Sequence, residues 1–362
     1  MRIGIPTEVK SFEGRVGLIP EACSELVRAG HQVSVQSGAG GQSGYLDEEY
    51  RRLGVQVVSD AAALYGTAQL IVKVKEPQPS ELALLRPDHV LFCYLHLAAE
   101  PDLARALQDI GLTAVAFETV ERQGSLPLLR PMSEIAGRLA VQYGTTLLQL
   151  PHGGRGVLLG SLPAATRGRV VIIGAGSAGG AAAAMAAALG ANVIVFDTKW
   201  ERLEAMRALG PNVTALYPYG ERVAQAVAEA DLLVGAVLLT GGRAPHVVSA
   251  EMVATMAPGA VIADISVDQG GCVETTRPTT WDAPTYVEHG VVHFTVTNMP
   301  GAVPRTASQA LSANLIPYVH ALAAGELESH GELRAGINVR GGQLVHRAVQ
   351  EALASGSERV NN

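Results

Sequence analysis

The sequence predicts an α/β protein made of two domains, each a parallel β-sheet with helices packed on both of its faces. Three observations support this fold class. The chain has 362 residues, more than a single hydrophobic core usually serves. Short apolar runs rich in β-branched residues alternate with segments that carry apolar residues at helical spacing. Of the residues, 48% are hydrophobic but only 4% aromatic, and there are 40 glycines, which is typical of sheets with many tight strand-to-helix turns.

The first part of the chain contains six predicted strands with helical segments between them. This alternation indicates a parallel sheet covered by helices. The predicted strands are 2–5, 31–35, 55–58, 70–74, 90–95 and 113–117, and the predicted helices are 20–29, 60–65, 80–85 and 101–108. A longer helical pattern follows at 132–150, and because it is long and fairly apolar we expect it to link the two domains.

A second βα series begins after a loop at 151–168 that is rich in Gly, Pro and Ser. Its predicted strands are 170–173, 193–196, 232–234, 261–264 and 291–296, and two helical patterns follow at 307–323 and 341–354. We expect these last two helices to return to the first domain. The sequence therefore predicts one domain from residues 1–130 plus 306–362, and another from residues 131–305.

The charge balance and the cysteines restrict the class of protein further. Lys and Arg number 27 against 34 Asp and Glu, a net charge of −7, and no basic run stands out, so we expect neither a nucleic-acid partner nor an anionic membrane. Cys23, Cys93 and Cys272 form no CxxC pair, which fits a reducing compartment. Since we find no apolar signal segment and no membrane span, we expect a cytoplasmic protein.

A glycine-rich motif directly follows the first strand of the second domain. The strand 170–173 runs into Gly174-Ala-Gly176-Ser-Ala-Gly179, and a run of helix-forming residues comes next. Here Gly174 permits a tight turn, Gly176 lets the backbone approach a pyrophosphate, and Gly179 lets the helix pack closely on the strand. An isolated GxGxxG is often a plain turn, but the strand before it and the helix after it indicate a Rossmann domain that binds a dinucleotide.

An acidic residue at the end of the next strand bears on which dinucleotide binds. Asp197 closes the run 192–197, where a carboxylate can accept hydrogen bonds from the ribose hydroxyls. The same charge repels a 2′-phosphate, so we expect NAD rather than NADP. Lys199 lies two residues further on and can weaken that preference. The other interpretation of Asp197 is a solvated acid at a strand end.

Three polar segments of the first domain occupy positions where a catalytic site can form. Lys73 and Lys75 alternate with apolar residues at a strand end, so both point to one face of the sheet. His96 closes another apolar run, and histidine titrates near neutral pH. Arg15 lies in the loop after the first strand, where a guanidinium can bind a carboxylate through two hydrogen bonds. Taken alone, each residue also fits an ordinary solvated or loop-bonded side chain.

The second domain contributes an acidic residue and a proline-containing loop. Asp268 follows the strand 261–264 and precedes a pair of glycines. Because this strand comes several βα units after the phosphate loop, we expect Asp268 beside the nicotinamide rather than the adenine. The loop 298–306 opens a helix and suits closure over a cofactor or an interdomain hinge. The alternatives are a turn-capping acid and a simple linker.

Six separated motifs together make the sequence similar to a known family. In order and spacing they resemble the alanine dehydrogenase family, whose wider group includes the NAD-binding subunit of proton-translocating transhydrogenase and saccharopine dehydrogenase. The resemblance spans nearly the whole chain. Its motifs are Glu13-x-Arg15-Val16-x-Leu18-x-Pro20, Lys73-Val-Lys75-Glu-Pro77, Tyr94-Leu-His96, Pro131-Met-Ser-Glu-Ile-Ala-Gly137, Gly174-Ala-Gly-Ser-Ala-Gly179 and Asp268-Gln-Gly-Gly271.

The resemblance implies a reversible, NAD-dependent oxidative deamination of L-alanine to pyruvate and ammonia. It implies that Arg15 and Lys75 hold the carboxylate and carbonyl oxygens of pyruvate, that His96 is the acid/base group, and that Asp268 supports the amine-bearing carbon. Residues 1–130 with 306–362 would bind substrate, residues 131–305 would bind NAD, and the active site would lie in a cleft between them. The dinucleotide residues that it implies are Gly174, Gly176, Gly179, Asp197, Ser133, Asn298 and Met299.

The family also implies a homohexamer, and one residue departs from its pattern. Gly17 stands where the family usually has alanine, so we expect a more mobile Arg15 loop and weaker substrate affinity. The sequence shows no cluster of metal ligands, and we predict no metal site.

Two further enzymes and one non-catalytic protein remain as alternatives. The transhydrogenase subunit carries an Arg-x-Gln-x-x-Asp-like loop where this chain has Met132-Ser-Glu-Ile-Ala-Gly-Arg138. Saccharopine dehydrogenase takes a bulky diacid, which calls for more basic residues than the segment 73–77 shows. A dinucleotide-binding protein without catalytic activity has no need of Arg15, Lys75, His96 and Asp268 together.

Overall fold

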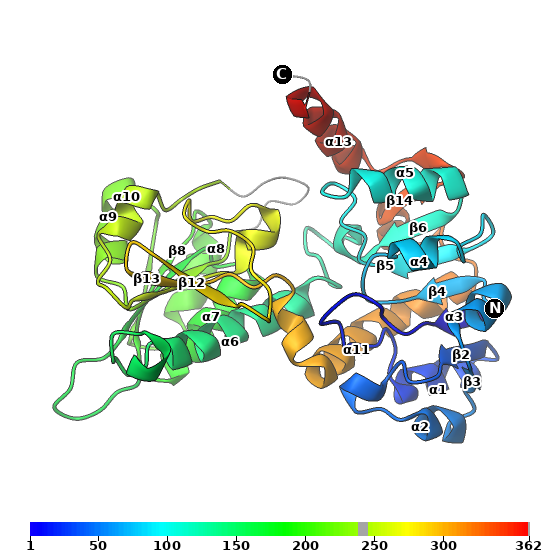
Figure 1. The fold of residues 1–362 in the computed structure, drawn as a ribbon, viewed down its shortest axis with the longest axis horizontal. Helices are drawn as coiled ribbons and strands as arrows, with labels where there is room; N and C mark the ends of the chain where they lie inside the picture. Colours follow the sequence, from blue (N-terminus) through cyan, green and yellow to red (C-terminus); the bar gives the residue numbers. More distant parts are fainter. Residues whose placement is uncertain (238–244, 361–362) are drawn as a thin grey trace. The chain divides into compact units, whose positions relative to one another are not determined.

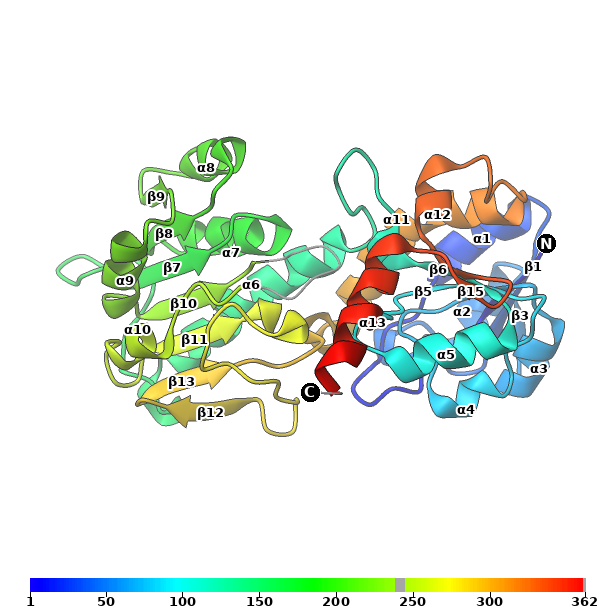
Figure 2. The ribbon, with the colours of Figure 1, turned by 90° about the horizontal axis from the view of Figure 1, so that it is seen from above.

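The computed structural model describes residues 1–237 and 245–360, and the chain divides into two compact units (Figures 1 and 2). Unit 1 comprises Met1–Met132 with Gly301–Asn362, and unit 2 comprises Ser133–Pro300. Helix α6 (Arg130–Leu147) carries the chain from unit 1 into unit 2. Each unit has its own sheet with helices on both faces, so the predicted fold of two doubly wound α/β domains is confirmed. The interdomain cleft stays a prediction.

Unit 1 contains an eight-stranded sheet in the order β15-β14-β6-β5-β4-β1-β2-β3. Strands β1 to β6 are parallel, whereas β14 runs antiparallel to β6, and β15 runs antiparallel to β14. The strands are β1 (Arg2–Ile5), β2 (Gln32–Gln36), β3 (Gln56–Val58), β4 (Leu70–Val72), β5 (Val90–Cys93), β6 (Thr113–Ala116), β14 (Ile337–Arg340) and β15 (Gln343–Leu344).

The helices of unit 1 cover its sheet because their apolar residues recur at helical spacing. Helix α5, for example, buries Leu103, Ala104 and Leu107, begins with Pro101 and ends at Gly111, which has a φ of 80°. The helices are α1 (Pro20–Arg28), α2 (Asp47–Arg52), α3 (Ala61–Thr67), α4 (Pro79–Leu82), α5 (Pro101–Ile110), α11 (Pro304–Ala323), α12 (Gly331–Ala335) and α13 (Arg347–Val360), with 3₁₀ turns η1 (Gly41–Ser43) and η2 (Phe117–Thr119).

The C-terminal part of unit 1 differs from its prediction. A helix over 341–354 is wrong for residues 341–346, which form the turn between β14 and β15, strand β15 itself and the approach to α13. Gly341 and Gly342 have φ values of 53° and 80°, a left-handed conformation that turns the chain back on itself. The helix begins only at Arg347.

Unit 2 contains a seven-stranded sheet in the order β12-β13-β11-β10-β7-β8-β9, parallel except for β12. Four of the five residues of β7 are buried, as a central parallel strand requires. The elements are β7 (Arg169–Ile173), β8 (Asn192–Phe196), β9 (Val213–Leu216), β10 (Leu232–Gly235), β11 (Val261–Asp264), β12 (Thr285–Glu288), β13 (Val291–Phe294), α7 (Ser177–Ala188), α8 (Trp200–Arg207), α9 (Gly220–Ala228), α10 (Ala250–Ala254), η3 (Leu150–His152), η4 (Ile265–Gln269) and η5 (Met299–Ala302).

Each sheet has one point where the order of its parallel strands reverses. In unit 1 this point lies between β1 and β4, and in unit 2 it lies between β7 and β10. The loops that leave adjacent strands there diverge to opposite faces and open a crevice at the carboxyl edge, where ligands of doubly wound folds bind. The strand order therefore indicates where in each unit functional residues are to be sought.

Candidate active site

The three predicted residues of unit 1 follow three neighbouring strands. Arg15 comes after β1, Lys75 after β4 and His96 after β5, and these strands lie side by side in the order β5-β4-β1. Because all three are parallel, their carboxyl ends meet at one edge of the sheet. The structure thus brings Arg15, Lys75 and His96 to the edge that contains the strand-order reversal.

Arg15 is buried and forms a two-point ion pair with Glu13. Its Nε donates to Glu13 Oε1 at 2.7 Å, its Nη2 donates to Oε2, and its Nη1 lies 3.1 Å from Met132 Sδ. Burial disfavours the charged guanidinium, but the Glu13 carboxylate outweighs it, so the pKa of Arg15 lies above its ordinary value. The guanidinium is therefore a fixed positive charge that can bind a small carboxylate.

Two serines of helix α11 hold the backbone of the Arg15 loop. Ser308 Oγ accepts from the amide of Val16 at 3.0 Å, and Ser312 Oγ accepts from the amide of Ile19 at 2.9 Å. Ser312 also donates to the carbonyl of Gly17 at 3.2 Å. A Cβ on Gly17 would lie 3.0 Å from the carbonyl oxygen of Val72, so the loop packs closely on β4. The expected weakening of substrate affinity by Gly17 stays a prediction.

Both lysines that follow β4 are buried, Lys73 more completely than Lys75. Lys73 is fully buried, and its Nζ lies 3.3 Å from Glu8 Oε2 and 3.0 Å from Glu81 Oε2. Burial disfavours its charge, but the two carboxylates outweigh burial and raise the pKa of Lys73. Glu8 also accepts from the amides of Val74 at 2.6 Å and Lys75 at 3.2 Å. Lys73 is thus structural, and Glu8 fixes the backbone that carries Lys75.

His96 combines an exposed imidazole with an unusual backbone. Its φ is 52°, in the left-handed region. Its ring stacks on that of Tyr94, with centroids 5.9 Å apart and planes at 8°. Tyr94 is itself fixed, since its hydroxyl donates to the carbonyl of Leu128 at 2.6 Å. The imidazole is therefore oriented on one face and open to a ligand, as proton transfer requires.

The three glycines of the unit 2 motif differ in how closely neighbouring atoms approach them. Gly174 has a φ of 100°, and a Cβ there would lie 2.5 Å from the carbonyl oxygen of Ala236. A Cβ on Gly179 would lie 1.7 Å from the carbonyl oxygen of Gly174, so α7 can pack on β7 only with glycine here. At Gly176 a Cβ would meet only an arginine nitrogen at 3.7 Å. Gly176 precedes α7, so this open space lies where amide groups can bind a pyrophosphate, and the residues fit a dinucleotide.

Asp197 lies beside this loop at the end of β8. Its Oδ2 accepts from the amide of Ala175 at 2.7 Å, and its Oδ1 accepts from the amide of Lys199 at 2.8 Å. Arg202 Nη1 approaches Oδ2 at 3.3 Å. The carboxylate is thus held against the phosphate loop, which is the placement that a ribose-binding acid requires.

Asp268 is exposed in η4, directly after β11, and a buried acid shapes its loop. Asp264 accepts from the amides of Ser266 and Cys272, both at 2.9 Å, and from the hydroxyl of Thr276 at 2.8 Å. Burial raises the pKa of Asp264, although these hydrogen bonds oppose the shift. Asp264 fixes both ends of the loop that presents Asp268.

The remaining predicted residues lie near the first and the last residues of unit 2 in the sequence. Ser133 lies near the start of α6, half-buried. Asn298 follows β13 with a φ of 59°, and Met299 is buried at the start of η5. Asn298 and Asp268 therefore belong to loops that follow the neighbouring strands β13 and β11 at the carboxyl edge.

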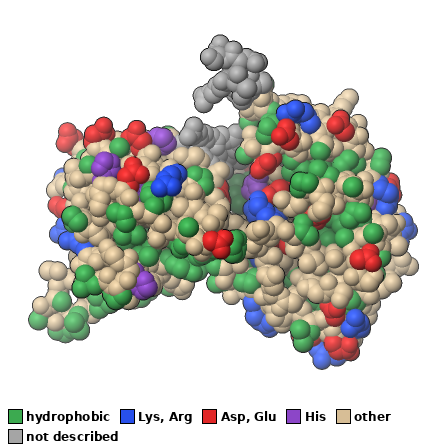
Figure 3. All heavy atoms as spheres, in the orientation of Figure 1, with side chains coloured by type: hydrophobic (Ala, Val, Ile, Leu, Met, Phe, Trp, Pro, Cys, Tyr) green, Lys and Arg blue, Asp and Glu red, His purple; other side chains and the backbone are tan. Residues whose placement is uncertain are grey.

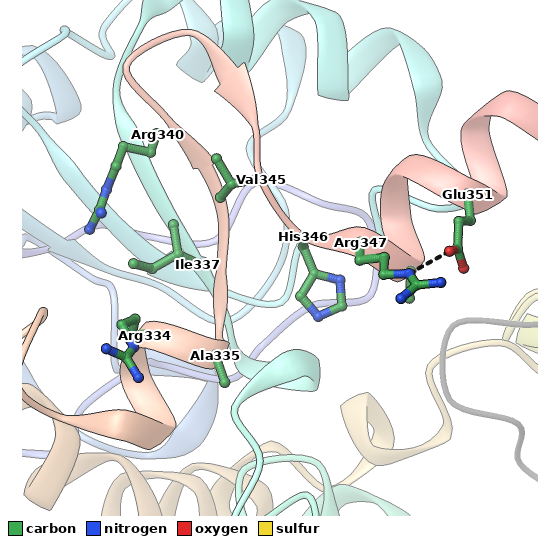
Figure 4. Close-up of a pocket in the computed structure, with 9 residues that line it drawn as sticks. Arg334, Ala335, Ile337, Arg340, Val345, His346, Arg347 and Glu351 are labelled. Carbon is green, nitrogen blue, oxygen red and sulfur yellow. Dashed lines mark hydrogen bonds and ion pairs between the residues drawn. The ribbon is translucent and has the colours of Figure 1, made fainter.

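Other groups offer little chemistry. Among residues 1–237 and 245–360, no three His, Cys, Asp or Glu side chains come together as metal ligands. Cys23, Cys93 and Cys272 are buried, and burial raises the pKa of each thiol, which keeps it protonated and unreactive. A pocket of about 570 Å³ in unit 1 is lined by residues of α12, β14 and α13, with His346 between Ile337 and Arg347 (Figure 4). None of the predicted site residues lines it.

Sequence reasoning missed the acidic residues that hold the candidate groups in place. Glu8 holds the Lys75 backbone, Asp264 holds the Asp268 loop, and Glu118 accepts from the amide of His96 at 2.7 Å. One signal was available, because Glu118 directly follows a predicted strand and so occupies the same kind of strand-end position as His96. Glu8 offered no such signal, since its partners lie on a strand distant in sequence.

The fold and these two sheet edges define a class of protein, a dehydrogenase with two doubly wound domains. The family assignment agrees. Residues 4–136 match the family model "Alanine dehydrogenase/PNT, N-terminal domain", and residues 140–347 match "Alanine dehydrogenase/PNT, C-terminal domain". The chain belongs to this alanine dehydrogenase/PNT family.

Individual relatives support the assignment along the whole chain. The alanine dehydrogenase of Bacillus subtilis (strain 168) is 47% identical over 359 residues, which are 98% of this chain and 95% of that protein. A solved L-alanine dehydrogenase has a TM-score of 0.94 and 50% identity, covering 98% of this chain and 99% of its own. The transhydrogenase of Sinorhizobium meliloti has a TM-score of 0.83 and 27% identity, covering 96% and 100%. The similarity is thus greater to the alanine dehydrogenases.

Proposed function

We propose that the protein is an L-alanine dehydrogenase, which reversibly oxidises L-alanine to pyruvate and ammonia with NAD. The observation that carries this proposal is the common edge at which β1, β4 and β5 end with Arg15, Lys75 and His96. The near-full-length identity of 47% to the B. subtilis alanine dehydrogenase supports it. Two cations and one imidazole match a small 2-amino or 2-oxo acid, which has a carboxylate, a polar group on Cα and one proton to exchange.

NAD is the cofactor that suits unit 2. When bound, it accepts the hydride that leaves Cα of alanine. Gly174, Gly176 and Gly179 allow its pyrophosphate to meet the start of α7, and Asp197 accepts hydrogen bonds from the adenosine ribose. In this proposal Asp268, Ser133, Asn298 and Met299 lie near the nicotinamide end. Residues 1–132 with 301–362 then form the substrate-binding unit.

The residues of unit 1 have separate roles in this reaction. Arg15 neutralises the substrate carboxylate and fixes its orientation. Lys75 binds the oxygen that replaces the amine on Cα and stabilises the charge that develops there. A neutral His96 takes a proton on an imidazole nitrogen when water adds to the iminium carbon, and stays protonated while the hydroxyl proton of the carbinolamine passes to the nitrogen that leaves as ammonia. Asp268 supports these proton transfers.

The proposal extends to the assembly and its surroundings. We propose a homohexamer in the cytoplasm, from the family resemblance and the isolated cysteines. No helix within the described part of the chain is long and apolar enough to cross a membrane. On the face drawn in Figure 3, Lys and Arg side chains are mixed with Asp and Glu side chains on the surface of each unit.

The deciding experiment follows NADH absorbance from L-alanine and NAD at alkaline pH. Parallel reactions replace L-alanine by D-alanine or glutamate and NAD by NADP, and repeat the assay with Lys75→Ala and His96→Ala. We expect turnover with L-alanine and NAD, lost in both variants. If NAD binds but no amino acid is oxidised, the proposal is wrong. Hydride exchange between two nucleotides then tests the transhydrogenase alternative, and its absence indicates a non-catalytic protein.

A further inference from the structure

The backbone of His96 is strained where the proposed chemistry requires precision. A φ of 52° places the residue in the left-handed region, which is strained for a residue with a Cβ. Such a conformation persists only when the surrounding structure enforces it. The turn after His96 contributes one contact, since the amide of Ala99 donates to the carbonyl of His96 at 2.9 Å. The hydrogen bonds that hold the backbone amide of His96 are stronger than this one.

The carboxylate of Glu118 binds two consecutive amides at this point. The amide of His96 donates to Oε1 at 2.7 Å, and the amide of Leu95 lies 3.2 Å from Oε1 and 3.3 Å from Oε2. Glu118 lies in η2, directly after β6, the strand that pairs with β5. Hydrogen bonds to an ionised acceptor are roughly twice as strong as those between neutral groups. Both amides thus point to one carboxylate, which fixes the peptide plane before His96.

We infer that Glu118 is a positioning residue that sets the imidazole of His96 for proton transfer by binding the amides of Leu95 and His96. This inference deepens the proposed function and rests on the role of His96 in it. Glu118 acts through the backbone and not on the substrate. When its carboxylate is lost, φ of His96 relaxes to the negative region, and the Cα–Cβ bond turns away from the sheet edge. A displacement of roughly 1 Å in a catalytic group costs about 100-fold in rate.

The test compares three changes at position 118 with one matched control. Glu118→Ala removes the acceptor, Glu118→Gln retains an oxygen that both amides can reach, and Glu118→Asp retains the charge on a side chain one methylene shorter. Glu121→Ala removes an exposed glutamate three residues further on. We expect Glu118→Ala to lower kcat with L-alanine about 100-fold, with KM for NAD changed less than about twofold. Glu118→Gln should retain kcat to within about threefold, and Glu121→Ala should match the wild type.

Hydrogen–deuterium exchange of the peptide that contains residues 95 and 96 gives a second readout, which needs neither substrate nor NAD. We expect faster exchange in Glu118→Ala and wild-type exchange in Glu118→Gln. Where Glu118→Ala does not fold, Glu118→Asp decides, with faster exchange and a lower kcat expected. If the wild type does not oxidise alanine, the proposed function fails on its own, and exchange alone still tests whether Glu118 holds the backbone.

Two results would overturn the inference. One is a folded Glu118→Ala with wild-type kcat and wild-type exchange at residues 95 and 96. The other is a Glu118→Gln as impaired as Glu118→Ala, because the charge of Glu118 and not its bonds to the amides would then matter. A low kcat with fast exchange in Glu118→Ala, rescued in Glu118→Gln, supports it.

Discussion

Both units have their candidate groups at the carboxyl edge of a parallel sheet, but the groups differ in kind. At the edge of unit 1, side chains provide the chemistry, since Arg15, Lys75 and His96 follow neighbouring strands. At the edge of unit 2, the backbone provides it, and Gly174, Gly176 and Gly179 supply open space and amide groups rather than charge. A small polar substrate needs point charges, whereas a pyrophosphate can bind a row of amides.

This difference extends to how each edge is held in shape. In unit 1 a carboxylate secures each candidate group, with Glu13 on Arg15, Glu8 on the amide of Lys75 and Glu118 on the amide of His96. In unit 2 the phosphate loop is secured sterically, because a side chain at Gly179 would overlap a backbone carbonyl. Substitutions at the edge of unit 1 should therefore act by removing a charge, and substitutions in the phosphate loop of unit 2 should act by introducing a steric clash.

The largest effects are expected from substituting two lysines of unit 1 that lie two residues apart, Lys73 and Lys75, and the two substitutions should act differently. Lys75→Met should lower kcat/KM for L-alanine by about 1,000-fold or more and lower the free energy of unfolding less than Lys73→Met does, because Lys73 is the more completely buried of the two lysines. Lys73→Met should instead lower the free energy of unfolding by about 3–5 kcal/mol, because it leaves Glu8 and Glu81 buried without their cation. Steady-state kinetics and denaturant unfolding measure the two effects. Equal loss of stability in both variants would contradict the distinction.

The next effect compares two glycines of unit 2. Gly179→Ala should destabilise unit 2 by about 3 kcal/mol, since its Cβ would lie 1.7 Å from a backbone oxygen and α7 must shift. Gly176→Ala meets nothing closer than 3.7 Å, so its melting temperature should equal that of the wild type while its Kd for NAD rises. Thermal unfolding and an NADH fluorescence titration check both. A destabilised Gly176→Ala would show that the space is not open.

A smaller effect concerns the choice of dinucleotide. Asp197→Ser removes the charge that repels a 2′-phosphate, and Arg202, which lies 3.3 Å from that carboxylate, becomes available to a phosphate. We expect the preference for NAD over NADP to fall about tenfold or more. The ratio of kcat/KM for the two cofactors measures it. An unchanged ratio would assign the preference to other residues.

The smallest effect is a pH dependence of stability in unit 2. His293 is fully buried, its Nε2 lies 2.8 Å from the hydroxyl of Thr275, and burial lowers its pKa below the ordinary value. The unfolded chain then binds a proton more readily than the folded one below about pH 6.5, so stability is lost as the pH falls through that value. His293→Gln should reduce the acid-induced fall in melting temperature. The exposed His152→Gln is the control and should leave that fall unchanged.

The sequence predicts what is local and misses what depends on distant contacts. The strand that runs into Gly174 and the strand ends at His96 and Asp197 are readable because each signal lies within a few residues. The burial of Lys73 is not readable, because alternation shows only that it shares a face with Lys75, while Glu8 and Glu81 determine its surroundings. Likewise β14 was missed, since it is short and its partner β6 lies far away in the sequence.

The most direct test of the account is a reciprocal one, in which NADH binding and alanine oxidation are measured on Lys75→Met and Gly176→Ala. We predict that Lys75→Met binds NADH with a Kd within about twofold of the wild type while it no longer oxidises L-alanine. Gly176→Ala should bind NADH at least about tenfold more weakly, with turnover restored in part by excess NAD. Loss of NADH binding in Lys75→Met, or normal binding in Gly176→Ala, would contradict the division of roles between the two sheet edges.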